Sequence, residues 1–255
     1  MSDPTQRFEG RAAAYDKARP SYPLAVLDLL ARDFHLRAGS VVADLGSGTG
    51  IFTAILLERG ATVFAVEPNA DMRATAEQRL GSIAGFRNVN GRAEATTLAT
   101  SSVDLVTAAQ AYHWFDRPRA HAEMKRILRK APNVGCIALV WNDRDTTATQ
   151  FTAAFEDVLR RRCPDYATLQ GRSEMPEAFN ELFGAGGWSR TALLHDQELD
   201  RDALIARAMS TSYAPREGEA HAALISDLRA LFDTHEEAGI VRLHYRCVVI
   251  GGCPA

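Results

Sequence analysis

Apolar residues in the first part of the chain fall into short continuous runs, which longer stretches of mixed character separate. Runs of this kind are typical of strands that are buried on both faces of a sheet. The predicted strands cover Val41 to Leu45, Val63 to Val66, Phe86 to Gly91, Val103 to Ala109 and Cys136 to Trp141. Polar residues interrupt the third run, so that strand is predicted mainly because the alternation of elements requires it.

The stretches between these strands carry apolar residues at helical spacing. The predicted helices cover Pro23 to Phe34, Gly50 to Arg59, Asp71 to Leu80 and Asp116 to Lys130. The last of them ends in basic residues, which stabilise a helix C-terminus. Regular alternation of strands and helices predicts a parallel, wound α/β sheet.

The pattern changes near residue 147, where helices begin to predominate. They are predicted over Phe151 to Arg162, Glu174 to Phe183, Asp200 to Met209 and Glu217 to Glu237. Strands return at Thr191 to Glu198 and Val241 to Ile250, and we expect these two to be antiparallel neighbours at the sheet edge. The helices between them are predicted to form an insertion over the cleft rather than a second domain.

The bulk properties agree with one large α/β domain of 255 residues. An apolar share of 46% and a charged share of 24% are ordinary for a globular protein, and nothing in the composition points to a disordered or fibrous chain. The formal net charge of -3 provides no strong field for a polyanion, so no nucleic-acid partner is expected.

The cysteines form no C-x-x-C pair, which disfavours a zinc site and a disulfide framework. Reduced, intracellular thiols are therefore expected at Cys136, Cys163, Cys247 and Cys253. The segment from Met1 to Tyr15 shows no signal-peptide pattern, and no apolar run is long enough to span a bilayer. These features predict a cytoplasmic protein without a membrane partner.

The most informative segment follows the first predicted strand, where an acidic residue precedes glycines at alternate positions. In order, it reads Asp44, Leu45, Gly46, Ser47, Gly48, Thr49 and Gly50. Glycines allow a sharp turn and a close approach of the backbone to a ligand, and the following helix offers free N–H groups at its start. The segment therefore predicts a nucleotide-like ligand.

The spacing of the glycines and two acidic residues favour S-adenosylmethionine over a nicotinamide dinucleotide as this ligand. A dinucleotide fingerprint would place its third glycine where Ile51 stands, which weakens a nicotinamide-dependent oxidoreductase as an alternative. Asp44 would repel a pyrophosphate but suits the cationic amino acid end of S-adenosylmethionine. Glu67, at the end of the second strand, can accept hydrogen bonds from both ribose hydroxyls of an adenosine.

With these residues in view, the run from Asp44 to Gly50, followed by Val66-Glu67-Pro68, resembles the first two motifs of class I S-adenosylmethionine-dependent methyltransferases. Gly91 to Glu94 is similar to the family's third-strand motif, and Ser102 to Val106 to its fourth strand. The resemblance covers residues 38 to 141. It implies S-adenosyl-L-methionine as the cofactor and S-adenosyl-L-homocysteine as the product.

The resemblance also implies that Ala93 or Glu94 lies near the adenine amino group and that Met72 packs on the ring. Without the motif, Met72 is equally a core side chain and Glu94 a loop carboxylate. The predicted cofactor-binding residues are Asp44, Gly46, Ser47, Gly48, Gly50, Glu67, Pro68, Met72, Ala93, Glu94, Gln110 and Arg19.

The segment from Gln110 to Phe115 is expected beside the reactive methyl group, because ligands of open α/β sheets bind outside the carboxyl ends of the strands. Its aromatic rings can stabilise a sulfonium, and His113 can take a proton from the acceptor. Alternatively, His113 and Trp114 are packing residues on the cleft floor. A carboxylate acceptor needs no base, so the enzyme hypothesis does not depend on His113.

The same segment lacks the [DN]-P-P-[YFW] signature of nucleobase methyltransferases, which disfavours that chemistry. Asn142-Asp143 follows the fifth strand, but no carboxylate ends the fourth strand to complete an oxygen shell. No metal is therefore predicted.

The stretch from Phe8 to Pro23 resembles the leading lid segment of small-molecule methyltransferases of the trans-aconitate and malonyl-carrier type. Arg19 is expected to pair with the cofactor's carboxylate or an acidic substrate. Tyr15 and Tyr22 are expected at the methyl site, unless the stretch is only a surface segment leading into the first helix. The predicted catalytic residues are His113 and Tyr15, and the predicted substrate-binding residues are Tyr22, Trp114 and Tyr213.

The predicted fold is a Rossmann-like, doubly wound, mostly parallel seven-stranded sheet with an antiparallel edge strand and a helical insertion over the cleft. The single domain, 1–255, divides into a lid and first helix (1–37), a cofactor-binding core (38–146), helical insertions forming a substrate cap (147–190 and 199–238) and edge strands (191–198 and 239–251). The leading hypothesis is methyl transfer to a small-molecule carboxylate or hydroxyl oxygen by a monomer or homodimer. The alternative is a non-catalytic S-adenosylmethionine-binding sensor or partner protein.

Overall fold

The computed structural model describes residues 19–130, 134–164, 166, 173–211 and 213–254, and their strands form one seven-stranded sheet. The strand order is β3-β2-β1-β4-β5-β7-β6. The strands are β1 (Val41–Leu45), β2 (Thr62–Val66), β3 (Phe86–Val89), β4 (Leu105–Ala109), β5 (Cys136–Arg144), β6 (Ser189–Leu199) and β7 (Val241–Gly252). The first five run parallel, while β7 is antiparallel to both β5 and β6. The predicted mostly parallel, seven-stranded α/β fold is confirmed.

Helices connect the strands and carry recognisable start signals. They are α2 (Ala25–Phe34), α3 (Ile51–Glu58), α4 (Ala70–Leu80), α5 (Arg117–Ile127), α6 (Gln150–Arg162), α7 (Pro176–Phe183), α8 (Arg201–Met209), α9 (Gly218–His235) and the short 3-10 helix η2 (Tyr112–Trp114). Thr149 caps α6 reciprocally with Thr152, and Asp200 caps α8 by accepting from the backbone N–H of Ala203. Such side-chain oxygens satisfy backbone donors that the first helical turn leaves unpaired.

The parallel part of the sheet is covered on both faces. Successive residues of β1 point to opposite sides, so Val42 packs with the apolar residues of α2, α3 and α4, whereas Ala43 packs with those of α5 and α7. Burial on both faces explains why these strands are continuous apolar runs rather than alternating patterns.

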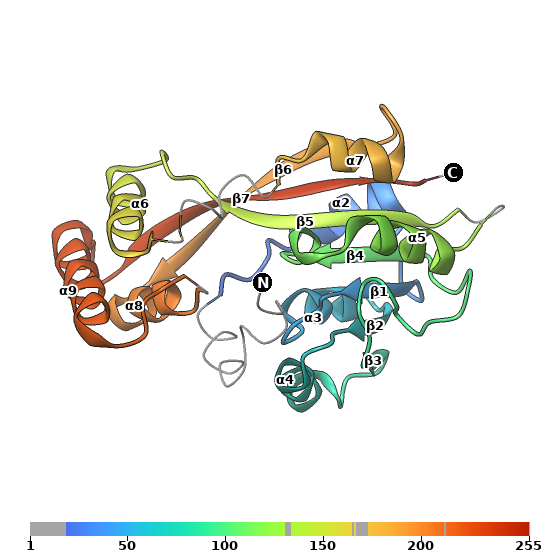
Figure 1. Cartoon of the computed structure of the whole chain (residues 1–255), viewed down its shortest axis with the longest axis horizontal. Helices are drawn as coiled ribbons and strands as arrows, with labels where there is room; N and C mark the ends of the chain where they lie inside the picture. The colour runs from blue at the N-terminus through green and yellow to red at the C-terminus, as the bar shows by residue number, and fades with distance from the viewer. Residues whose placement is uncertain (1–18, 131–133, 165, 167–172, 212, 255) are drawn as a thin grey trace.

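A third apolar cluster lies at the far end of the three longest strands, which extend well past the parallel strands (Figure 1). There α6, α8 and α9 pack on residues of β6 and β7, including Leu199 and Leu243. We call these three helices the cap. The predicted insertion 147–190 is divided, because α6 belongs to the cap whereas α7 packs against the sheet with α5.

Two predicted boundaries were wrong for one shared reason. Leu128 adopts an extended backbone and forms a parallel bridge with Val103. The helix predicted to reach Lys130 therefore ends at Ile127, and the strand predicted from Val103 begins as β4 at Leu105.

The expectation of four reduced cysteines was also wrong. Cys136 and Cys253 form a disulfide although 117 residues separate them in sequence. The cause is the antiparallel pairing of β5 with β7, which places Ile137 opposite Gly252 and so brings the start of β5 beside the C-terminal end of β7. Cys163 and Cys247 are free and buried.

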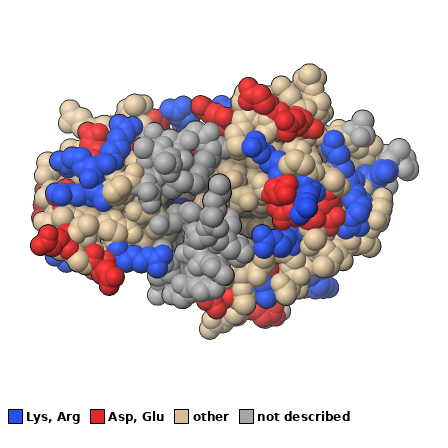
Figure 2. Space-filling model, viewed as in Figure 1, with Lys and Arg blue, Asp and Glu red and all other residues tan. Residues whose placement is uncertain are grey.

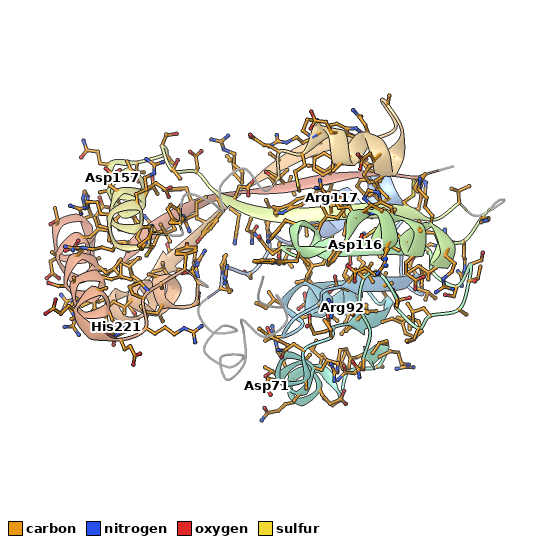
Figure 3. All side chains as sticks on the ribbon, viewed as in Figure 1. Asp71, Arg92, Asp116, Arg117, Asp157 and His221 are labelled. Atoms are coloured by element: carbon orange, nitrogen blue, oxygen red, sulfur yellow. A yellow bond between two sulfur atoms is a disulfide. The ribbon has the colours of Figure 1, made fainter. Side chains whose placement is uncertain are left out.

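On the face shown in Figure 2, charged side chains of both signs occur over the cap and over the parallel part of the sheet. Among the described residues, none of the helices has the length and apolarity needed to cross a bilayer. Asp157 and His221 lie on the cap, whereas Asp71 and Arg92 lie on the side of the parallel strands (Figure 3).

Candidate functional site

A cavity of about 730 Å³ lies at the carboxyl ends of the parallel strands and extends to the cap. Beside it, β1 lies between β2 and β4, the point at which the strand order reverses and open α/β sheets bind their ligands. The volume is in the range of cofactor and small-molecule sites. Every predicted site residue in the described part of the chain except Gly50 lines it.

The turn after β1 depends on its glycines. Gly46, Gly48 and Gly50 have left-handed φ values of 66°, 57° and 82°, which side-chain-bearing residues rarely adopt. A Cβ atom added to Gly46 would lie 2.7 Å from the Cβ of Ala111, whereas one added to Gly48 meets nothing within 4 Å. The backbone at Gly48 is therefore open to the cavity, and Gly50 instead begins α3.

Glu67 lies at the end of β2 and is 8% exposed. Its Oε2 accepts a hydrogen bond from Gly48 N at 3.0 Å, and its Oε1 accepts one from Asn69 N at 2.8 Å. Burial raises the pKa of this carboxyl, and the two backbone donors oppose that shift. The carboxylate is thus fixed at the cavity wall by the turn that it faces.

Asp44 is fully buried beneath the same turn. The hydroxyl of Thr53 donates to its Oδ2 at 2.6 Å, and the hydroxyl of Thr107 donates to its Oδ1 at 2.8 Å. Burial raises the pKa of Asp44 to about 6, although both hydroxyls favour the ionised form. Asp44 is therefore an ionised carboxylate near neutral pH that lines the cavity with limited solvation.

These groups fit S-adenosylmethionine. The Oγ of Ser47 is buried and has no hydrogen-bond partner among the described residues, so it is available to a bound polar group. Asp44 and Glu67 supply negative charge for a ligand that carries an ammonium and a sulfonium, and Glu67 retains acceptor capacity for hydroxyls.

The residues predicted around the adenine line one end of the cavity together with Pro68. Met72 is 4% exposed, and Ala93 is 5% exposed. Glu94 accepts a hydrogen bond from Asp116 N at 2.8 Å, so its carboxylate already holds the start of α5. Met72 and Ala93 therefore both line the cavity, and their contact with an adenine stays a prediction.

The segment between β4 and α5 also lines the cavity. Gln110 has a left-handed φ of 56°, and its side-chain amide donates to Asn142 O at 3.2 Å. His113 and Trp114 are half-buried on η2, with ring centroids 5.0 Å apart, and both line the cavity. Tyr112 instead turns into the core, where its hydroxyl is 2.8 Å from Nε2 of His121.

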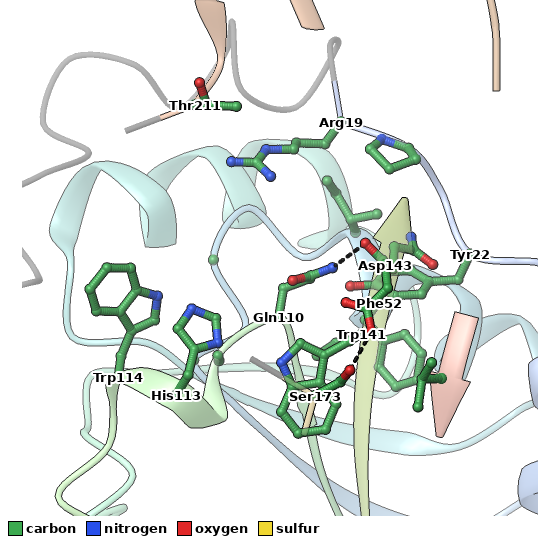
Figure 4. Close-up of a pocket in the computed structure, with 18 of the residues that line it drawn as sticks. Arg19, Tyr22, Phe52, Gln110, His113, Trp114, Trp141, Asp143, Ser173 and Thr211 are labelled. Atoms are coloured by element: carbon green, nitrogen blue, oxygen red, sulfur yellow. Dashed lines mark hydrogen bonds between the residues drawn. The ribbon is translucent and has the colours of Figure 1, made fainter. Parts of the chain in front are cut away.

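Arg19 lies on the cap side of the cavity, where Figure 4 shows it beside Thr211 and across from His113 and Trp114. Arg19 donates to Ser210 O at 3.4 Å. Tyr22 is buried, and its ring meets Phe52 edge-on at 4.9 Å. Tyr15, predicted as a second catalytic residue, lies outside the described residues.

Sequence reasoning missed two arginines on the cap side of the cavity. Arg144 ends β5, and Arg207 lies on α8, three residues after the buried Leu204. A cation within the apolar stripe of a helix was the available signal for Arg207. Tyr213, which was predicted at the substrate, lies on the same side with its ring 4.9 Å from that of Tyr166.

Comparison with known proteins gives one family match, to a model described as a methyltransferase domain, over residues 43–132. An uncharacterized methyltransferase of Mycobacterium tuberculosis is 36% identical over 184 residues, which are 71% of this chain and 68% of that protein. A methyltransferase-like protein of Schizosaccharomyces pombe is 37% identical over 144 residues, which are 55% and 53% of the two chains.

Solved structures show the same fold at lower identity. A protein of Anaeromyxobacter dehalogenans described as a type II methyltransferase superposes with a TM-score of 0.61 at 24% identity, covering 93% of this chain and 99% of that one. A protein of Anabaena variabilis described as a methyltransferase from an antibiotic biosynthesis pathway gives 0.65 at 22% identity, covering 91% and 98%. The long outer strands and the cap are included in these matches, since nearly the whole chain is covered.

Proposed function

Because the chain belongs to the class I S-adenosylmethionine-dependent methyltransferases, we propose that it methylates a small molecule at a carboxylate or hydroxyl oxygen. The observation that carries the proposal is the continuity of one cavity, from the Asp44 and Glu67 carboxylates past His113 to the cap. A cavity of this volume, lined in part by residues of the cap helices, suits a small acceptor rather than a polymer.

When bound, the cofactor S-adenosylmethionine supplies an electrophilic methyl group on a positively charged sulfur. We assign its amino acid end to Asp44, Ser47 and the turn at Gly48, because a carboxylate and a buried hydroxyl without a partner among the described residues line the cavity there. Glu67 receives the ribose hydroxyls. Arg19 is assigned to the cofactor's carboxylate.

The adenine end is assigned to Pro68, Met72, Ala93 and Glu94. Met72 presents a polarisable apolar surface suited to a flat ring, and Ala93 offers its backbone N–H. The carboxylate of Glu94 also receives the N–H of Asp116, so this contact would couple the adenine pocket to the start of α5.

At the acceptor end, the residues of this chain position the nucleophile and exclude water. Gln110 and Trp114 form one wall, while Tyr22 and Tyr213 come from the N-terminal segment and the cap. For a carboxylate acceptor, the protein accelerates methyl transfer mainly by aligning the accepting oxygen with the methyl group, because a carboxylate is already nucleophilic. For a hydroxyl acceptor, His113 or Tyr15 takes the proton, as general bases do.

The test has two stages. Calorimetry first measures binding of S-adenosylmethionine and S-adenosylhomocysteine to the purified protein, and turnover is then followed as release of S-adenosylhomocysteine over a panel of carboxylic acids and alcohols. Methyl esters or ethers found by mass spectrometry support the proposal. Tight cofactor binding with methylation of amines or thiols alone would exclude the oxygen acceptor.

A further inference from the structure

Arg207 is a buried cation without a counter-ion among the described residues. It is 4% exposed and lines the cavity from α8. Its Nε donates to the hydroxyl of Tyr245 at 3.1 Å, but its Nη1 is buried and has no hydrogen-bond partner in the part of the chain that the structure describes. Arginine is almost never buried unless it is paired, so this guanidinium has unused capacity to bind an anion.

Arg144 adds a second guanidinium to the same region. Its Nη2 lies 3.3 Å from Oε2 of Glu156, while its Nε is buried and has no hydrogen-bond partner within residues 19–130, 134–164, 166, 173–211 and 213–254. The other oxygen of Glu156 lies 3.5 Å from Nη2 of Arg160. One carboxylate is thus shared between Arg144 and Arg160. The cluster of Arg144, Arg160, Arg207 and Glu156 therefore retains a net positive charge.

The electrostatics agree with this geometry. Burial lowers the pKa of Arg207, Tyr245 opposes that shift, and the cations Arg19 and Arg144 lower the pKa further. Arg207 therefore faces two like charges and would be stabilised by a negative ligand between them.

Acidic residues also line the cavity, and the two that flank Arg144 in sequence each have a partner of their own. Asp145 is paired with Arg246, whose Nη2 lies 2.8 Å away. Asp143 accepts a hydrogen bond from the hydroxyl of Ser173, as Figure 4 shows. These carboxylates add negative charge to the same cavity, so they disfavour a multiply charged group such as a phosphate more strongly than a singly charged carboxylate.

We propose that Arg207, supported by Arg144, binds a carboxylate of the methyl acceptor and so makes the enzyme selective for acidic small molecules. A guanidinium with free N–H groups matches the two oxygens of a carboxylate. Tyr166 and Tyr213, beside the arginines, provide apolar surface for the body of the molecule. The inference rests on the proposed function, since it names the acceptor class of the same cavity.

The experiment uses the full chain saturated with S-adenosylhomocysteine, so that cofactor binding is established first. A panel of small aliphatic and aromatic carboxylic acids, each matched with its primary amide, is then titrated by ligand-observed NMR and calorimetry. We expect acids to bind at least about 10-fold more tightly than their amides, as for hydrogen bonds to charged groups. No acid binding better than its amide would overturn the inference without affecting the cofactor result.

Substitutions show which residues cause the preference for acids over amides. Arg207→Gln should remove the preference for acids while leaving the affinity for S-adenosylhomocysteine within about 2-fold, whereas Arg229→Gln, an exposed arginine of α9, should change neither. Arg144→Gln provides an independent variant if Arg207→Gln does not fold. Unchanged acid affinity in a folded Arg207→Gln protein would show that Arg207 only supports Tyr245.

Discussion

The carboxylate of Glu67 accepts a hydrogen bond from the backbone N–H of Gly48, at 3.0 Å. The carbonyl of Val66 accepts two more from the same turn, from Gly46 N at 2.8 Å and Ser47 N at 3.2 Å. The end of β2 therefore holds the turn that follows β1. The residue assigned to the ribose also shapes the loop assigned to the amino acid.

Glu67→Gln is expected to weaken binding of S-adenosylhomocysteine by about 10- to 100-fold, the range for losing charge-assisted hydrogen bonds. The amide would turn a donor toward Gly48 N or Asn69 N, both of which are donors themselves. Calorimetry measures the dissociation constant. Glu58→Gln, at an exposed position of α3, is the matched control, and equal affinities in the two variants would contradict the assignment.

Asp44→Asn should separate stability from binding. The pKa of Asp44 is raised from 3.8 to about 6, so ionising it opposes folding near neutral pH. A shift of about 2 units corresponds to about 3 kcal/mol, an upper bound on what the amide could restore. We expect a higher Tm for the variant without ligand at pH 7.5, together with at least about 10-fold weaker binding of S-adenosylmethionine.

The contribution of Asp44 to the stability of the fold depends on pH with a definite sign. Because the folded-state pKa of Asp44 lies above the unfolded value, its stabilising contribution is complete below about pH 4 and is lost as the pH rises through about 6. The Tm difference between Asp44→Asn and the wild type should therefore shrink as the pH falls from 7.5 to 4.5. A difference that is constant over this range would mean that Asp44 does not titrate there.

The cofactor half of the site could be predicted because its chemistry lies in consecutive residues. The strand ending at Leu45, the glycines after it and Glu67 at the next strand end follow from local pattern and parallel topology alone. Parallel strands bring their carboxyl ends to one edge, so residues at two strand ends must be neighbours.

The acceptor half could not be predicted in the same way. Arg144 and Arg207 line one cavity because β5 and β7 are longer than the other strands that flank the site and carry the chain to the cap, and no local pattern fixes that length. The disulfide was missed for a similar reason, since the register of β5 with β7 decides which cysteines meet. Long-range register depends on packing, which a single sequence does not reveal.

A count of free thiols tests the register of β5 with β7, because this register brings Cys136 and Cys253 together. With Cys136 and Cys253 joined, two of the four cysteines remain as thiols, so the unfolded, unreduced protein should bind two equivalents of Ellman's reagent. The native protein should react slowly, because burial raises the pKa of Cys163 to about 11. Cys253→Ser should give three equivalents by releasing Cys136. Four equivalents in the wild type would show that the disulfide is absent.

Two glycine substitutions in the turn should differ in a way that reports its geometry. Gly46→Ala and Gly48→Ala both place a side chain at a left-handed φ, which costs about 1–2 kcal/mol. Only Gly46→Ala also brings a Cβ atom to 2.7 Å from Ala111, so urea unfolding should show the larger loss of stability for that variant. Gly48→Ala adds its methyl group in open space, where we place the cofactor, and should weaken S-adenosylhomocysteine binding more than it lowers stability. Equal stability losses would mean that the turn does not pack against Ala111.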